Sequence, residues 1–405
     1  MSQAMPLRFE PVVAELALPD SELLADELAV SRCADPFEQW LRWEERANLV
    51  GFRMAIDPVA LEVASIPAER VLVQRAANVP NAVLQRFLRD GRVLFPKHPL
   101  NRDAGVAFFS APVAERWPAR FTSSRTVVLA PERGEPACSV KLPTDHPHPD
   151  FEQPEKTHLR EEAEDAIRIA ALIQRIDAAI GQDPALRIVS ESITVLVPGS
   201  EHGFVVRDLR PLQDGHFYLP ALSIPWVGRQ IASLHREPFE LFWGRHYAES
   251  VGRAKATLLA RYGLQYDTPN PQNVLVQLDL TLRPTGAIVL RDLGDVNSLM
   301  REVAEGENPW GAMQAAPKPE TPCSFWAFGE ADSLSVESKV LEDWYVRHDR
   351  AYLATLARFF ELPPSALAPD GEDRFAGLRR CFGADGAGEA LRAAFERRVR
   401  RARQA

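Results

Sequence analysis

Short extended runs separated by turns dominate residues 92–142. The runs cover residues 93–95, 106–109, 125–129 and 138–142, and proline and glycine lie in the segments between them. Antiparallel strands can be joined by turns, whereas parallel strands need a crossover that usually contains a helix. We therefore expect an antiparallel, strand-rich lobe in this part of the chain.

Helical patterns lie on both sides of this lobe. Apolar residues recur at helical spacing within residues 20–50, and a shorter helix is expected from 77 to 90, ending at Gly91. Later strands are expected at 187–197 and 204–209, and later helices at 161–181, 226–235, 239–262 and 336–360. The sequence thus predicts an α+β protein with three regions: helical residues 1–90, the strand-rich lobe 91–215, and residues 216–405 with helices and a hairpin.

The composition is that of an ordinary globular protein. The chain has 405 residues, is 46% hydrophobic and carries a net charge of −9, so nucleic acid is not a favoured partner. Its four cysteines form no Cys-x-x-Cys pair, which argues against a zinc knuckle, an iron–sulfur cluster or a disulfide scaffold. Neither a signal-peptide pattern nor an apolar run of ~20 residues is present, so we expect a cytoplasmic protein without a membrane partner.

The predicted hairpin carries residues that suggest chemistry. Apolar runs at 274–276 and 288–290 flank a turn-rich segment, which places Asn273 at the start of one strand and Asp292 at the end of the next. An amide oxygen and a carboxylate are hard ligands that suit Mg²⁺ carrying the phosphates of a nucleotide. The alternative interpretation is that both are ordinary turn or cap residues.

The strand-rich lobe offers hydrogen-bond donors for phosphate. Ser123, Ser124 and Arg125 form a hydroxyl cluster with a cation at its edge, and Lys141 lies on a nearby expected strand. The alternative is a turn for the serines and a solvated surface for the cations. Arg160 stands at the start of the helix 161–181, where a cation is unfavourable because the helix dipole is positive there. We therefore expect Arg160 to bind a substrate carboxylate or a phosphate.

Taken in chain order, motifs across residues 88–300 resemble those of the NRPS-independent siderophore synthetases, the aerobactin-synthetase type. Phe95-Pro-Lys-His-Pro-Leu-Asn101 is similar to the family's His-Pro-x-His-Pro segment, and Thr122-Ser-Ser-Arg-Thr126 is similar to its Thr-Ser-Ser-x-Arg-Thr. Val140-Lys-Leu-Pro143 and Lys156-Thr-His-Leu-Arg160 resemble its Lys-Leu-Pro strand and the Thr-x-x-x-Arg that opens the next helix. Further similarities are Phe204-Val-Val-Arg-Asp-Leu-Arg-Pro211 to Arg-Glu-x-Pro, Tyr262-Gly-Leu264 to Tyr-Gly-Ile, Asn270-Pro-Gln-Asn273 to His-x-Gln-Asn, and Arg291-Asp-Leu-Gly294 to Arg-Asp-Phe-Gly.

This resemblance implies a cupped-hand fold, with residues 1–90 thumb-like, 91–215 fingers-like and 216–405 palm-like. It also implies an ATP- and Mg²⁺-dependent ligase in siderophore or related biosynthesis. Such an enzyme adenylates a polycarboxylic acid such as citrate and then condenses it with an amine or hydroxyl compound. The implied partners are these small molecules, without nucleic acid or membrane and with a homodimer as a possible assembly.

The resemblance assigns roles position by position. The cofactor-binding set is Ser123, Ser124, Arg125, Lys141, Asn270, Gln272, Asn273 and Asp292. The catalytic set is Lys141, Arg125 and His98, the Mg²⁺ ligands are Asn273 and Asp292, and the substrate-binding set is Arg160, Thr157 and Arg207.

The chain departs from the family pattern at three positions. Asn270 stands where the family has the first His of His-x-Gln-Asn, Phe95 stands where it has the first His of His-Pro-x-His-Pro, and Arg125 comes one position early. Three interpretations stay open: Lys141 and Arg125 suffice for the phosphates, the substrates are unusual, or the chain no longer adenylates.

Two other functions compete with the ligase. A kinase-like phosphotransferase is suggested by residues 267–273 with Asp292-Leu-Gly294, but Asn273 follows Asp267 by six positions, whereas a protein kinase's Asp and Asn are five apart. A catalytically silent homologue that binds a siderophore or a partner synthetase is suggested by the altered histidine positions.

Overall fold

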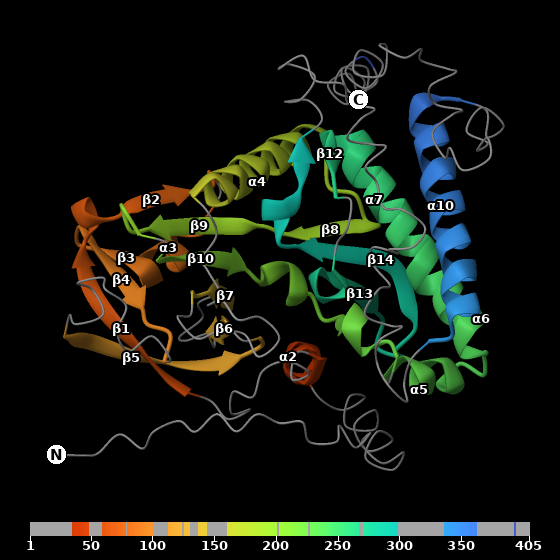
Figure 1. Cartoon of the computed structure of the whole chain (residues 1–405), viewed down its shortest axis with the longest axis horizontal. Coiled ribbons are helices and arrows are strands. Elements are labelled where there is room, and N and C mark those ends of the chain that lie inside the picture. The colour runs from red at the N-terminus through yellow and green to blue at the C-terminus, as the bar shows by residue number, and fades with distance from the viewer. Residues whose placement is uncertain are drawn as a thin grey trace.

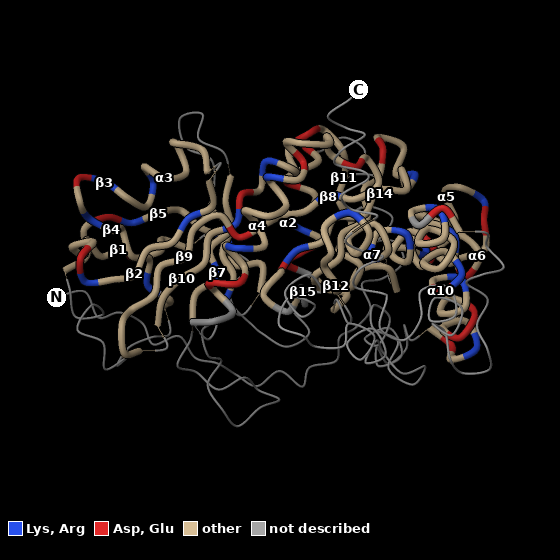
Figure 2. Tube along the Cα trace, turned by 90° about the horizontal axis from the view of Figure 1, so that it is seen from above, with Lys and Arg blue, Asp and Glu red and all other residues tan. Residues whose placement is uncertain are grey.

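The structure, a computed structural model, describes residues 35–47, 59–77, 79–99, 112–123, 125–129, 137–143, 160–200, 202–225, 227–266, 270–298, 336–362 and 393. Within these residues, helices pack against two main β-sheets that lie side by side (Figure 1). None of the described helices is long and apolar enough to cross a membrane. Acidic and basic residues are interspersed along the described chain (Figure 2).

The larger sheet has nine strands and is antiparallel at each pairing. In spatial order the strands are β2 (Leu72–Arg75), β9 (Glu191–Leu196), β10 (Gly203–Asp208), β7 (Cys138–Lys141), β6 (Thr126–Leu129), β5 (Val113–Phe121), β1 (Val59–Pro67), β4 (Arg92–Pro96) and β3 (Leu88–Arg89). Because side chains alternate along each strand, every second residue points to one face of this sheet. That face forms an apolar core with α3 (Asn81–Phe87), to which the central strands contribute Val140, Ile193, Phe204 and Val206. The antiparallel lobe expected from residues 92–142 is thus confirmed.

The smaller sheet contains the predicted hairpin. Its order is β11 (Phe217–Pro220), β13 (Val274–Leu278), β14 (Pro284–Arg291) and β8 (Leu186–Val189), and β8 runs parallel to β14 while the other pairs are antiparallel. A further short pair joins β12 (Leu264–Gln265) to β15 (Asn297–Ser298). Asn273 directly precedes β13 and Asp292 directly follows β14, as expected from the sequence.

Helices cover the smaller sheet. They are α4 (Arg160–Ile180), α5 (Val227–Leu234), α6 (Phe239–Trp243), α7 (Glu249–Tyr262) and α10 (Ser338–Phe360). Apolar side chains from all five pack into one core with β11, β13 and β14. In Figure 1, α7 and α10 lie alongside each other at the end of the molecule remote from β1 and β5.

Helix α2 (Pro36–Ala47) lies between the two sheets. The Asp35 carboxylate caps it by accepting hydrogen bonds from the backbone N–H groups of Phe37 and Glu38, at 2.9 and 3.1 Å. Trp40 and Leu41 pack with Val128 of the larger sheet and with residues of the smaller one, and Trp43 packs into the core of the smaller sheet. The tryptophans of this helix are therefore packing residues.

Several expected elements differ from the structure. The helix expected at 77–90 is shorter, because Asp90 and Gly91 both have positive φ and form the hairpin turn between β3 and β4. Residues 59–67 and 72–75, expected within a helical region, are strands of the larger sheet, and β5 was not expected either. The expected strand 187–197 is divided at Ser190, with β8 in the smaller sheet and β9 in the larger one.

The remaining expected elements agree or cannot be compared. The helix expected at 239–262 is present, interrupted by one π-helical turn, Gly244–Ala248, and ended by Gly263 with φ 67°. The expected strand 106–109 and the first of the two helices expected in residues 20–50 lie outside the described residues. The division into three domains stays a prediction.

Candidate functional site

One face of the larger sheet presents charged residues close to the smaller sheet. In the register of β7 and β10, Lys141 lies opposite Val205 and Arg207 lies opposite Ser139. Because strand side chains alternate, Lys141 and Arg207 point to the same face, away from the apolar core formed by Val140 and Val206. Glu191 of β9 pairs with Arg207 and shares this face.

Asp292 reaches this face from the smaller sheet. Its carboxylate accepts hydrogen bonds from the Lys141 Nζ, which is 3.2 Å from both carboxylate oxygens, and from the Arg207 Nη2 at 2.5 Å. The exposed fractions are 11% for the Lys141 side chain, 6% for Arg207 and 18% for Asp292. A largely buried cluster of opposite charges therefore joins the two sheets.

The backbone at Asp292 has an unusual conformation that its neighbours support. Asp292 has φ 62° and ψ 62°, in the left-handed region that few non-glycine residues adopt. The Tyr266 hydroxyl lies 3.1 Å from the carbonyl oxygens of both Arg291 and Asp292, so its proton is shared between them. The Asn273 Nδ2 donates to the Tyr266 hydroxyl oxygen at 3.2 Å and lies 3.5 Å from the Asp292 Oδ2.

Arg207 is held between two carboxylates. Its Nε donates to the Glu191 Oε1 at 2.9 Å while its Nη2 donates to Asp292, and the Glu191 side chain is only 3% exposed. Burial opposes the charge on Arg207, yet the Asp292 and Glu191 carboxylates outweigh burial and raise the pKa of the guanidinium above its usual value. Arg207 stays charged, with its Nε held by Glu191 and its Nη2 on Asp292.

The surroundings of Lys141 compensate its charge less completely than those of Arg207. Burial lowers the pKa of the Lys141 ammonium, and the nearby Arg207 and Arg125 charges lower it further. The Asp292 carboxylate acts in the opposite direction but does not cancel these effects. An additional anion beside Lys141 would therefore be strongly attracted.

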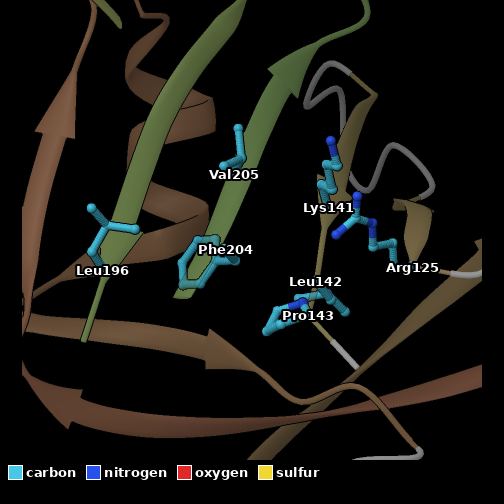
Figure 3. A pocket seen from close by; sticks show the side chains of 7 residues that line it. All are labelled: Arg125, Lys141, Leu142, Pro143, Leu196, Phe204 and Val205. Carbon is cyan, nitrogen blue, oxygen red and sulfur yellow. The ribbon is translucent and has the colours of Figure 1, made fainter. Parts of the chain in front are cut away.

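A recess next to Lys141 contains a second cation. It is lined by Arg125, Lys141, Leu142, Pro143, Leu196, Phe204 and Val205, and it contains about 250 Å³ of space that includes open solvent. Figure 3 shows the nitrogen-bearing ends of Lys141 and Arg125 close together on one side, with Leu196, Phe204 and Val205 on the other. The recess thus has a cationic side and an apolar side.

Ser123 lies in the turn that precedes β6. Its hydroxyl oxygen accepts a hydrogen bond from the backbone N–H of Thr126 at 3.1 Å, so it has the turn role considered as an alternative above. The same turn places Arg125, whose carbonyl oxygen accepts a hydrogen bond from the backbone N–H of Leu142 at 2.7 Å. Ser124 and Thr157 lie outside the described residues, and of Arg160 only the backbone, which begins α4, is described.

His98 contacts a side chain on the apolar face of the larger sheet. Its imidazole is 2% exposed and contacts Phe121 edge-on, with ring centroids 5.5 Å apart. Phe121 pairs with Val127 and Val127 with Val140, so Phe121 points to the face of the sheet opposite Lys141. The catalytic role expected of His98 stays a prediction from the sequence motif.

Asn270 and Gln272 shape the segment before β13. The Asn270 Oδ1 caps the short helix Pro271–Asn273 by accepting from the backbone N–H of Gln272 at 2.9 Å. The Gln272 carbonyl oxygen accepts from the Arg291 Nε at 3.0 Å. These two residues therefore connect both ends of the hairpin next to Asp292.

Asp292 and Asn273 could supply only a minority of the ligands that a magnesium ion needs. Among the described residues, no group of three His, Cys, Asp or Glu side chains could hold a metal. Mg²⁺ commonly takes one or two protein oxygens and completes its shell with substrate phosphate and water. Asp292 and Asn273 provide such a pair once the Asn273 amide is flipped, because the atom 3.5 Å from the Asp292 Oδ2 is the Asn273 Nδ2.

Sequence reasoning did not identify three contributors to this site. Glu191 binds Arg207, Tyr266 supports the backbone of Asp292, and Glu44 of α2 accepts a hydrogen bond from Arg291. Tyr266 lies between the Tyr-Gly-Leu and Asn-Pro-Gln-Asn motifs and could have been noted there. Glu191 and Glu44 carry no local signal because their partners come from distant strands.

Solved structures with a similar fold include two aerobactin synthetases and a petrobactin biosynthesis protein. The ATP-bound aerobactin synthetase IucA from a hypervirulent pathotype of Klebsiella pneumoniae matches with a TM-score of 0.54 and 16% identity, over 83% of this chain and 75% of IucA. The aerobactin synthetase IucC from the same pathotype matches with a TM-score of 0.51 and 14% identity, over 84% of this chain and 74% of IucC. The petrobactin biosynthesis protein AsbB from Bacillus anthracis str. Sterne matches with a TM-score of 0.51 and 13% identity, over 96% of this chain and 81% of AsbB.

This similarity is detected in the fold, since no protein-family model and no curated protein sequence matches the chain. The neighbours share its α+β architecture, which confirms the fold that the sequence motifs implied. The chain has the fold of the aerobactin synthetases IucA and IucC and of the petrobactin biosynthesis protein AsbB.

Proposed function

We propose that this protein is an ATP-dependent ligase that adenylates a polycarboxylic acid such as citrate and condenses it with an amine or hydroxyl compound. The product would be a siderophore or a related natural product. The observation that carries the proposal is the cluster of Lys141, Arg207, Asp292 and Asn273 between the two sheets. This cluster lies on a fold shared with an ATP-bound aerobactin synthetase.

The first step of the proposed reaction needs cations near the leaving group. A carboxylate oxygen of the acid attacks the α-phosphorus of ATP, the bond from that phosphorus to the bridging oxygen breaks, and pyrophosphate leaves with the electron pair. Negative charge develops on the pyrophosphate, and fixed cations stabilise that charge more than the charge of bound ATP. Lys141 and Arg125, on one side of the recess, are suited to this role.

Mg²⁺ would supply further charge neutralisation on the phosphates, and Asp292 with Asn273 would hold it.

In the second step the amine or hydroxyl attacks the acyl carbon, and AMP leaves. Arg160 and Thr157 are proposed to bind the acid. Arg207, expected to contact the acid, has two nitrogens on Glu191 and Asp292, and we propose that it orients Asp292.

A substrate screen tests this proposal. Purified protein is incubated with ATP, Mg²⁺ and a matrix of di- and tricarboxylic acids against amines and amino alcohols, and released pyrophosphate and AMP are measured. Pyrophosphate and AMP that appear only with an acid support the ligase. ADP in place of AMP would identify a phosphotransferase, and absence of ATP binding by calorimetry would identify a catalytically silent homologue.

A further inference from the structure

Asp292 fills a position in which a phosphate oxygen would bind. Its two oxygens lie 3.2 Å from the Lys141 Nζ, and one of them lies 2.5 Å from the Arg207 Nη2. A phosphate presents the same kind of oxygen to the same donors at similar distances. Lys141 and Arg207 of the larger sheet therefore share a carboxylate that comes from the smaller sheet.

Arg207 and Lys141, the two cations that contact Asp292, differ in whether another carboxylate is at hand if Asp292 moves away. Arg207 has a second carboxylate, Glu191, whose Oε1 lies 2.9 Å from the Arg207 Nε. The carboxylate that contacts the Lys141 Nζ is Asp292, and Arg125 and Arg207 add positive charge around Lys141. If Asp292 moved away, Lys141 would be the cation that most needs a new anion, because a buried charge without a partner is costly.

We propose that Asp292 is an internal counter-ion that competes with phosphate for Lys141. A phosphate chain then binds Lys141 only together with a divalent cation. The cation binds the Asp292 carboxylate, and the Lys141 ammonium can then bind the phosphate. This inference rests on the proposed function in one respect, namely that the anion of this site is the phosphate chain of a nucleotide.

The local backbone is built for such an exchange. Tyr266 holds the carbonyl oxygens of Arg291 and Asp292, so the turn is fixed independently of the Asp292 carboxylate. The Asn273 Nδ2 lies 3.5 Å from the Asp292 Oδ2, and a flip of the Asn273 amide would bring its oxygen to the same side. A divalent cation could thus bind both side chains after a flip of the Asn273 amide and a rotation of the Asp292 side chain, with no change of the backbone.

The test measures binding of inorganic pyrophosphate by calorimetry, with a chelator present to remove divalent cations. Asp292→Asn removes the competing charge and keeps the size of the side chain, and asparagine tolerates a left-handed backbone. We expect the variant to bind metal-free pyrophosphate about tenfold more tightly than the wild type, because a charge-assisted contact no longer has to be displaced. Asp292→Gly, which also suits this backbone, provides a second variant.

Glu191→Gln is the matched control. It removes one negative charge from the same Arg207 but leaves the Lys141–Asp292 contact in place. We expect its affinity for metal-free pyrophosphate to rise less than about threefold, because Lys141 stays occupied. The double variant Asp292→Asn with Lys141→Ala should lose the gain.

The inference is overturned if neither Asp292 variant binds metal-free pyrophosphate more tightly than the wild type. It also fails if Glu191→Gln gains as much, or if the gain survives without Lys141. Addition of Mg²⁺ should tighten pyrophosphate binding in the wild type and have little effect in Asp292→Asn. These measurements need no turnover. A gain in pyrophosphate affinity that depends on Lys141 would therefore support the counter-ion role of Asp292 even if the substrate screen found no ligase. An active ligase whose Asp292 variants show no gain would refute the counter-ion role and leave the proposed function intact.

Discussion

The Glu44 carboxylate of α2 accepts a hydrogen bond from the guanidinium of Arg291, the residue immediately before Asp292. Glu44 is 1% exposed and Arg291 11%, so the ion pair is buried. Arg291 also donates to the Gln272 carbonyl oxygen at 3.0 Å, which ties the two ends of the hairpin together. A helix from the start of the chain therefore fixes the strand end that presents Asp292.

Replacing Glu44 by alanine should strongly destabilise the fold. The Arg291 charge would stay buried without its carboxylate, which typically costs ~3–5 kcal/mol in the free energy of unfolding. Urea unfolding followed by circular dichroism measures the loss. Glu38→Ala is the control: Glu38 is 52% exposed and pairs with Arg120, so its removal should cost no more than ~1 kcal/mol. Equal losses in the two variants would contradict the importance assigned to the Glu44–Arg291 pair.

Replacing Gly252 by alanine should force α7 and α10 further apart and destabilise their packing. A Cβ at this position would lie 2.2 Å from the backbone carbonyl oxygen of His348, which cannot move without shifting the helix. We expect Gly252→Ala to lower the melting temperature, with a loss of ~1–3 kcal/mol typical of overpacking. At Gly244 a new Cβ would lie 3.0 Å from the Arg347 Cδ, on a flexible side chain, and 3.2 Å from the Trp344 Cδ1, and no backbone atom is among its nearest neighbours. Gly244→Ala should therefore stay within ~1 kcal/mol of the wild type, and a larger loss there than at Gly252 would refute this packing argument.

His348 should make the fold less stable in mild acid. Burial lowers the pKa of this imidazole below 6.5, and the Lys255 charge acts in the same direction, while the Asp349 contact at 3.1 Å partly offsets them. As the pH falls below 6.5, the unfolded chain binds a proton that the folded chain does not, so stability present above that pH is lost toward the lowered pKa. In His348→Gln, the difference in unfolding free energy between pH 7.5 and pH 5.5 should be smaller than in the wild type. An unchanged difference would mean that other groups cause the acid sensitivity.

Loss of either partner of the central ion pair should abolish catalysis without unfolding the protein. We expect Lys141→Ala and Asp292→Ala each to lower carboxylate-dependent AMP formation by at least about 100-fold, as removal of a charge-stabilising group does in other enzymes. Lys339→Ala, which removes an exposed lysine of α10, should retain activity. Near-wild-type turnover in either of the first two variants would exclude this cluster as the active site.

Arg160→Ala should have a different kinetic effect. If Arg160 binds a carboxylate present in both the ground state and the transition state, its loss should raise the apparent KM for the acid about tenfold or more and change kcat less. Initial rates over a range of acid concentrations separate the two parameters. A fall in kcat at unchanged KM would place Arg160 among the groups that act on the transition state.

The hairpin with Asn273 and Asp292 was predictable because its signals are local. Two apolar runs and a turn fix which residues lie at the strand ends, and antiparallel pairing brings those two ends together. The contact from Asp292 to Lys141 spans 151 residues, and it was anticipated only because the family motifs placed both residues at one nucleotide. Arg207 was assigned to the substrate because its carboxylate partners could not be seen in the sequence.

Other features depend on interactions that a single sequence does not show. Asp90-Gly91 satisfies the signal for a helix end and the signal for a hairpin turn equally well, so the helix expected at 77–90 was too long. The apolar run 187–197 looks continuous, yet β8 and β9 separate at Ser190 to join different sheets, since tertiary pairing decides which sheet each half enters. Glu191 alone on a strand is typical of a solvent-facing position, and only the pairing of β9 with β10 buries it beside Arg207.

The two neighbouring glutamates of α2 have partners that are synthesised much later. Glu45 binds Arg120, 75 residues further along the chain, and Glu44 binds Arg291, 247 residues further along. Such pairings have a high contact order and form slowly, because long loops must close before any contact compensates for their entropy. As the nascent chain leaves the ribosome, this helix emerges ahead of both sheets, but its second anchor exists only after the hairpin has been translated. The helix made before both sheets thus gains its last anchor after them, and the cluster of Lys141, Arg207 and Asp292 reaches its final arrangement only in chains whose synthesis has passed Asp292.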